Sequence, residues 1–150
     1  MPVEVVRRAD PSAVAGLLAS VPEWFGIPEA NAQYVADAGQ LPSYLAVDAE
    51  EVVGVALLSE HFPEARELHL LAIRRDRHRQ GIGRLLVEAV VADLSQAGVR
   101  LLEVHTVGPS YENEGYARTR EFYLALGFVA MTELERIDWS GPTLILVRPL

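Results

Sequence analysis

The sequence contains no cysteine and no lysine among its 150 residues. The absence of cysteine excludes disulfides, thiolate–metal sites and a covalent acyl-cysteine intermediate. The absence of lysine excludes a Walker A phosphate loop, which needs a Gly-Lys-Ser/Thr segment. No apolar run approaches the ~18–20 residues of a membrane span, and the first residues lack the order of basic, apolar and small residues of a signal peptide. We therefore expect a cytoplasmic protein with no membrane partner.

Basic residues are also few, with 13 against 21 acidic ones and a formal net charge of −8 at pH 7. Such a chain lacks the broad basic surface of a nucleic-acid binder, so we expect no nucleic-acid partner. Its charge favours a cationic substrate through long-range attraction. The histidines at positions 61, 69, 78 and 105 show no HExxH or similar spacing, so we expect no metal site. The length predicts a single domain over residues 1–150.

The pattern of apolar residues predicts an α/β fold (α+β by some schemes) with a mixed sheet. The clearest helix covers residues 81–97, where Ile82, Leu85, Leu86, Ala89, Val90 and Leu94 follow the spacing of a buried helical face. Strands at 67–73 and 101–106 flank this helix and predict a crossover between parallel strands. Other strands are predicted at 3–8, 44–47, 52–59, 129–137 and 143–147, and other helices at 11–20, 29–38 and 116–126.

Residues 74–84 (RRDRHRQGIGR) form the densest basic segment of this acidic chain. Gly81 and Gly83 lie between a predicted strand and a predicted helix, where bare backbone N–H groups at a helix N-terminus bind anions. A solvated, tight turn is the plain alternative. A Rossmann fingerprint needs a third small residue where Leu86 stands and usually opens its domain, so a nucleotide-dependent oxidoreductase is a weaker reading. We interpret the segment as the docking site of a phosphate-bearing ligand.

Two segments together resemble the GNAT superfamily of acyl-CoA-dependent N-acyltransferases. Residues 68–98 resemble its motif A, Gln/Arg-x-x-Gly-x-Gly/Ala, with His78 at the first position, and residues 116–128 (YARTREFYLALGF) resemble its motif B. The resemblance implies a sheet of about seven strands with about four helices and a splayed parallel strand pair at its centre. It implies acetyl-CoA as co-substrate. The implied cofactor contacts are Leu71, Ala72, Ile73, His78, Arg79, Gln80, Gly81, Ile82, Gly83, Arg84 and Tyr123.

The implied reaction is direct attack of an amine on the acetyl thioester in a ternary complex. An alkyl amine is almost fully protonated at pH 7, so a general base is useful. Strand alternation places Glu67 and His69 on one face with Leu71. We predict His69 as the base, with Glu67 orienting it or binding the ammonium; exposure of both near a strand start is the alternative. His105 and Glu103 are the reserve candidates.

The resemblance to motif B makes Tyr123 the predicted acid for the departing thiolate, although an aromatic at helical spacing is more often a core residue. Trp24, Phe25 and residues 108–115 are candidate walls for the acceptor. We expect a small amine or a peptide amine as acceptor and leave a homodimer open. Because His78 and Tyr116 depart from the family pattern, a catalytically silent coenzyme A-binding module on the same fold is the alternative function.

Overall fold

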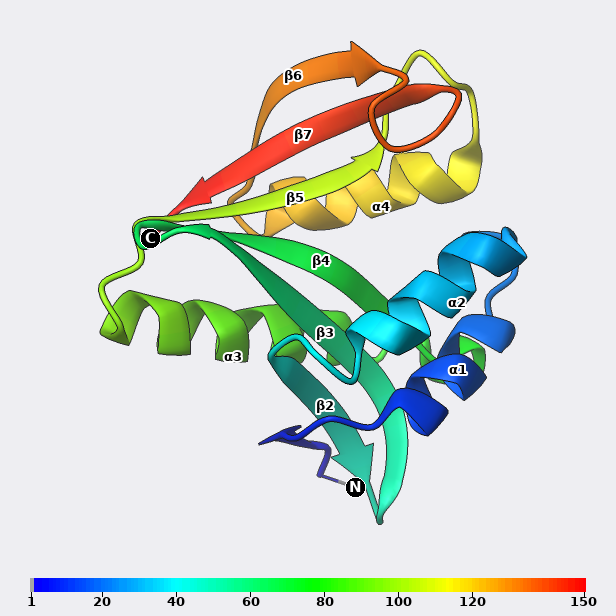
Figure 1. Cartoon of the computed structure of the whole chain (residues 1–150), viewed down its shortest axis with the longest axis vertical. Helices are drawn as coiled ribbons and strands as arrows, with labels where there is room; N and C mark the ends of the chain where they lie inside the picture. The colour runs from blue at the N-terminus through cyan, green and yellow to red at the C-terminus, as the bar shows by residue number, and fades with distance from the viewer. Residues whose placement is uncertain (1) are drawn as a thin grey trace.

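The computed structural model describes residues 2–150, so Met1 of the predicted domain lies outside the described residues. One seven-stranded sheet has the order β1-β2-β3-β4-β5-β7-β6, with helices on both faces (Figure 1). Its strands are β1 (Glu4–Arg7), β2 (Ser43–Asp48), β3 (Glu51–Phe62), β4 (Ala65–Ile73), β5 (Leu101–Val107), β6 (Val129–Glu135) and β7 (Pro142–Pro149). The helices are α1 (Pro11–Ala19), α2 (Pro28–Asp37), α3 (Ile82–Gln96) and α4 (Glu114–Ala125), with a 3₁₀ turn η1 (Arg75–Arg77). The predicted mixed α/β fold is confirmed, and none of the described helices has the length and apolarity needed to cross a membrane.

Each face of the sheet has its own apolar core. The buried stripe of α3, together with Tyr123 of α4, packs on strand residues such as Leu102. The opposite core joins α1 to strand residues such as Leu57, with α2 residues packed at its edge. Each fully buried aliphatic side chain contributes about 1.5–3 kcal/mol. Leu85 was predicted on the buried face of α3 but is 39% exposed, because it lies at the edge of the stripe.

Gly54 allows α3 to approach the sheet closely. A Cβ at Gly54 would lie 2.9 Å from Cδ1 of Ile73, 3.1 Å from Cδ1 of Leu86 and 3.2 Å from Cγ2 of Ile82. A larger residue would push the start of the helix away from β3. The missing side chain therefore leaves room for Ile82 and Leu86 of α3 to pack over β3.

β4 contains a β-bulge at His69. Two successive residues of β3 pair with Leu68 and Leu70, so His69 has no partner on that strand. A bulge shifts the pleat by one residue. Leu70 consequently packs in the core beneath α1, whereas Leu71 packs against the core beneath α3. The prediction that Leu71 shares a face with Glu67 and His69 is wrong for this reason.

The parallel pairing of β4 with β5 is short. It joins residues 65–68 of β4 to residues 101–104 of β5 and then stops. Both strands continue, β4 to Ile73 and β5 to Val107, and they diverge as they do so (Figure 1). The splayed parallel pair implied by the family resemblance is therefore present. From His69 onward, the edge of β4 that faces β5 has no strand partner, which leaves backbone donors and acceptors for a ligand.

Candidate active site

The N-terminus of α3 has the features of an anion site. Gly81 is its N-cap in the left-handed region (φ 78°) and no side chain caps the helix. Arg79 is also left-handed (φ 63°), so the loop turns twice before the helix begins. The first intrahelical bond runs from the N–H of Leu85 to Gly81. The N–H groups of residues 82–84 therefore point out of the helix at its positive end, where a phosphate binds favourably.

Most of the arginines before α3 already have partners. The ion pairs are Arg74 with Glu51 and Asp76, Arg75 with Glu23, and Arg77 with Asp48. Within residues 2–150, no carboxylate oxygen lies within 4.0 Å of the Arg79 or Arg84 side-chain nitrogens. Among the described residues of this segment, Arg79 and Arg84 are thus the arginines with no carboxylate partner, and they can meet a phosphate without breaking an ion pair.

Gly83 links the two family motifs in space. A Cβ at Gly83 would lie 3.0 Å from the ring of Phe122 on α4. The Phe122 ring meets Tyr123 edge-on at 5.2 Å, and Tyr123 meets Phe128 at 5.3 Å. Gly83 therefore allows α4 to pack against the start of α3, which places Tyr123 near the splayed strands.

His78 and Trp24 close the loop over the end of β4. Nε2 of His78 donates to the carbonyl of Ile73 at 2.8 Å, and the ring meets Trp24 edge-on at 5.8 Å. Trp24 also lies beside Gly115, where an added Cβ would be 3.2 Å from the indole. The carbonyl of Trp24 accepts a hydrogen bond from the Tyr116 hydroxyl. Trp24 was predicted as an acceptor wall; the structure places it between the starts of α3 and α4.

His69 is held by a carboxylate that sequence reasoning missed. Nε2 of His69 lies 2.8 Å from Oδ2 of Asp37, the last residue of α2. Gln33 donates to the other oxygen of Asp37 at 2.8 Å, and Tyr34 meets the His69 ring edge-on. The His69 side chain is 29% exposed, so a substrate can reach it. The contact to His69 that was expected of Glu67 is thus made by Asp37, whereas Glu67 contacts His61.

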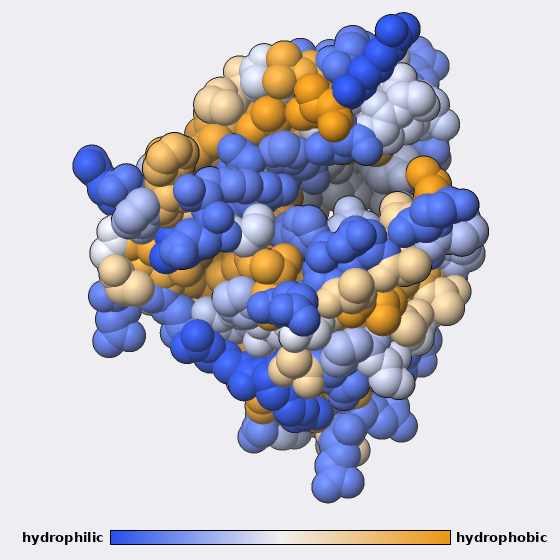
Figure 2. Space-filling model, in the orientation of Figure 1, coloured by the Kyte–Doolittle hydropathy of each residue, from blue (hydrophilic) through white to orange (hydrophobic). Residues whose placement is uncertain are grey.

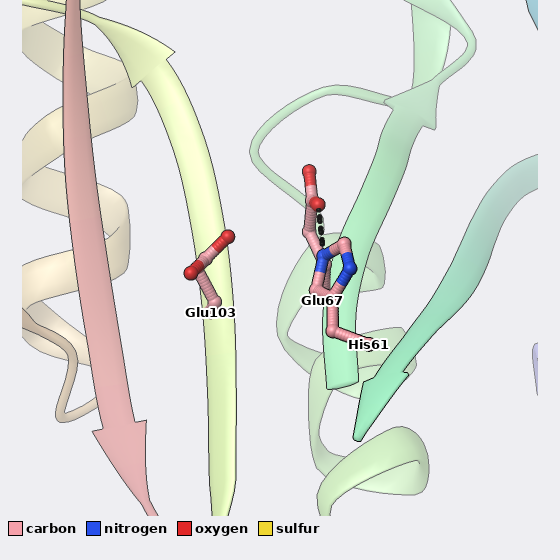
Figure 3. A group of neighbouring side chains, drawn as sticks. All are labelled: His61, Glu67 and Glu103. Carbon is pink, nitrogen blue, oxygen red and sulfur yellow. Dashed lines mark hydrogen bonds and ion pairs between the residues drawn. The ribbon is translucent and has the colours of Figure 1, made fainter. Parts of the chain in front are cut away.

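Glu67 belongs instead to a row of histidines and carboxylates. It is the register partner of Glu103 on β5, and Nε2 of His61 lies 2.7 Å from its Oε1 (Figure 3). His105 bridges Glu103 at 2.7 Å and Asp138 at 2.8 Å. Burial lowers the pKa of His105, but the hydrogen bonds to Asp138 and Glu103 and the charges of Glu67 and Asp138 outweigh it and raise that pKa overall. His105 is therefore protonated up to a higher pH than an ordinary histidine.

Tyr123 is buried, with 6% of its surface exposed. Burial raises the pKa of its hydroxyl far above the usual range, and the nearby Tyr34 raises it further. Tyr123 is therefore neutral at any ordinary pH and can only donate a proton. The surface is hollowed between α2 and α4 (Figure 2).

Comparisons with known proteins agree with this geometry. The sequence model of the GNAT acetyltransferase domain matches residues 39–130, which include β4, the loop and α3. The chain belongs to the GNAT acetyltransferase family. A GNAT-family structure from Desulfovibrio desulfuricans is 24% identical, with a TM-score of 0.83 over 99% of each chain. No curated protein sequence matches this GNAT chain.

Two further GNAT structures share the fold. The ribosomal-protein-S18-alanine N-acetyltransferase of Escherichia coli is 18% identical, with a TM-score of 0.76 over 97% of this chain and 94% of that one. A GNAT acetyltransferase from Elizabethkingia anophelis with acetyl-CoA bound is 16% identical, with a TM-score of 0.70 over 97% and 98% of the two chains. At these identities the likeness shows the fold alone.

Proposed function

We propose that this protein transfers an acetyl group from acetyl-CoA to a primary amine of a small molecule or peptide, in the cytoplasm and by direct attack in a ternary complex. One observation carries the proposal. The unpaired edge of β4 starts at His69 and leads to the uncapped N-terminus of α3. A row of backbone donors that ends in an anion site suits a long ligand with a thioester at one end and a pyrophosphate at the other.

Cofactor binding follows from this arrangement. The N–H groups of residues 82–84 hold the pyrophosphate, and Arg79 and Arg84 neutralise the remaining phosphate charge. The backbone of residues 71–73 hydrogen-bonds the pantetheine arm along the open strand edge. A backbone N–H there also polarises the thioester carbonyl, and such preorganised donors are usually the largest contribution to catalysis.

His69 and Tyr123 supply the proton transfers. His69 takes the proton of the attacking ammonium, directly or through water, and Asp37 stabilises the resulting imidazolium. The amine nitrogen bonds to the acetyl carbon, and the carbon–sulfur bond breaks. Tyr123, which its raised pKa keeps protonated, gives its proton to the departing thiolate and takes up the second proton that the nitrogen loses as the amide forms. The carboxylate of Asp37 beside His69, together with the net charge of −8, favours a cationic acceptor.

Release of free thiol tests this function. The protein is incubated with acetyl-CoA and a panel of primary amines, and thiol release is followed together with the mass of the product. The chain has no cysteine, so the protein contributes no background thiol. We expect turnover with at least one amine, giving a product heavier by one acetyl group. Tight acetyl-CoA binding without release for any amine would instead support the silent binding module.

A matched pair of charge reversals tests the anion site. Arg84→Glu places a carboxylate beside the N–H groups of α3 and should weaken coenzyme A binding by at least ~10-fold, the loss of about 1.4 kcal/mol. Arg100→Glu makes the same charge change at the other end of α3, next to Gly98, and should leave the affinity unchanged. Equal affinities of both variants in calorimetric titration would remove Arg84 from the cofactor site.

A further inference from the structure

Three side chains from three strands converge on one point of the open sheet face. His61 near the end of β3, Glu67 of β4 and Glu103 of β5 each offer a ligand atom, and these atoms all lie within 4.8 Å of one another (Figure 3). Glu67 and Glu103 are register partners on neighbouring strands. Like charges in that position repel, so the pair gains from a cation placed between them.

The chain itself supplies no permanent cation to this pair. Within residues 2–150, the ion-pair partners of Glu67 and Glu103 are the histidines His61 and His105, and no arginine reaches either carboxylate. A neutral imidazole beside two carboxylates is a set of nitrogen and oxygen ligands that suits a divalent transition metal. An ammonium ion needs no imidazole, so the presence of His61 favours a metal over an acceptor amine at this point.

Further hydrogen bonds orient Glu103 from outside the three-ligand cluster, as such bonds orient the ligands of many metal centres. Nε2 of His105 lies 2.7 Å from Oε1 of Glu103, and its Nδ1 lies 2.8 Å from Oδ2 of Asp138. Metal-ligating groups are commonly oriented by such hydrogen-bonded partners. His105 and Asp138 would thus hold Glu103 in place for an ion.

We propose that His61, Glu67 and Glu103 bind a zinc ion, with the fourth position left to water. Nε2 of His61 and Oε1 of Glu67 lie 2.7 Å apart, and the ion replaces the hydrogen bond between them. The sequence predicted no metal because the ligands come from separate strands and follow no motif. The proposal is independent of acetyl transfer, since none of its steps involves coenzyme A.

Metal titration of the whole chain, without a tag and after chelator treatment, tests the site. Zn²⁺ binding is followed by calorimetry, and Co²⁺ is used as a spectroscopic probe. We expect one ion per chain and the absorption bands of low-coordinate cobalt. His61→Ala and Glu103→Gln should each weaken Zn²⁺ binding by at least ~10-fold, and Asp138→Asn by ~10–100-fold.

Glu60→Gln is the matched control. It removes the same charge from β3, beside His61, but Glu60 pairs with Arg66 and is not one of the three ligands, so Zn²⁺ affinity should be unchanged. Circular dichroism checks that each variant is folded. The wild-type protein gives a test that needs no variant. If the Co²⁺ spectrum in its presence stays that of the hydrated ion, the site does not exist. Equal Zn²⁺ affinity in the wild type, His61→Ala and Glu103→Gln would also overturn the assignment.

Discussion

Asp37→Asn removes one charge from the contact that holds His69 and keeps its shape. The two side chains are 2.8 Å apart and are 22% and 29% exposed. A hydrogen bond to a charged group contributes about 1.5–3 kcal/mol and a neutral one about 0.5–1.5 kcal/mol. Since solvent reaches this pair, we take a difference of about 1–1.5 kcal/mol, which corresponds to a fall in kcat of roughly 10-fold. His69→Ala, which removes the proposed base, should lower kcat by ~10²–10⁴-fold.

The assay is steady-state thiol release by Asp37→Asn, His69→Ala and the double variant, with coenzyme A affinity measured alongside. Asp37 acts through His69, so Asp37→Asn should cost nothing further in the His69→Ala background. Coenzyme A affinity should stay within about twofold of the wild type in all three. Asp93→Asn, an equivalent change on α3, is the control. If Asp37→Asn lowered kcat tenfold both in the wild type and in the His69→Ala background, the positioning role of Asp37 would be refuted.

Three further outcomes are expected. Gly54→Ala should lower the free energy of unfolding by about 1–3 kcal/mol through crowding against Ile73, and an unchanged denaturation midpoint would contradict that contact. Tyr123→Phe should lower kcat by no more than ~10²-fold, since a thiolate leaves readily; an unchanged kcat in thiol-release kinetics would exclude it as the acid. Asp138→Asn removes a contact that raises the pKa of His105. The variant should therefore lose stability fully below about pH 6, and the loss should vanish as the pH rises through the raised pKa. Thermal melts that show an equal loss at about pH 9 would oppose this.

Local patterns in the sequence were enough to predict the α3 helix and the turn that precedes it. The stripe of α3 and the turn at Gly81 depend on residues a few positions apart, and both are present in the structure. The α4 helix begins at Glu114, two residues before the predicted start, because Asn113 caps it by accepting from the N–H of Tyr116. The parallel pair followed from the strand–helix–strand order.

The surroundings of His69 are set by contacts between segments that lie far apart in the sequence. The bulge at His69 is set by its pairing with β3, and no periodicity within β4 reveals it. Asp37 lies 32 residues before His69, at the end of α2. A single acidic residue at a helix end does not by itself indicate a partner for a distant histidine. The carboxylates that neutralise Arg75 and Arg77 likewise come from other elements. Strand pairing and helix docking decide these contacts, so residue types alone could not predict them.

The proposed acetyl-CoA site lies beside His69, along the open edge of β4 and at the N-terminus of α3. A crystal structure of this protein with coenzyme A would test this site. We expect the pyrophosphate against the N–H groups of residues 82–84 and the sulfur between β4 and β5, on the side of His69 and Tyr123. Coenzyme A bound elsewhere, or a sulfur directed away from the space between these strands, would contradict it.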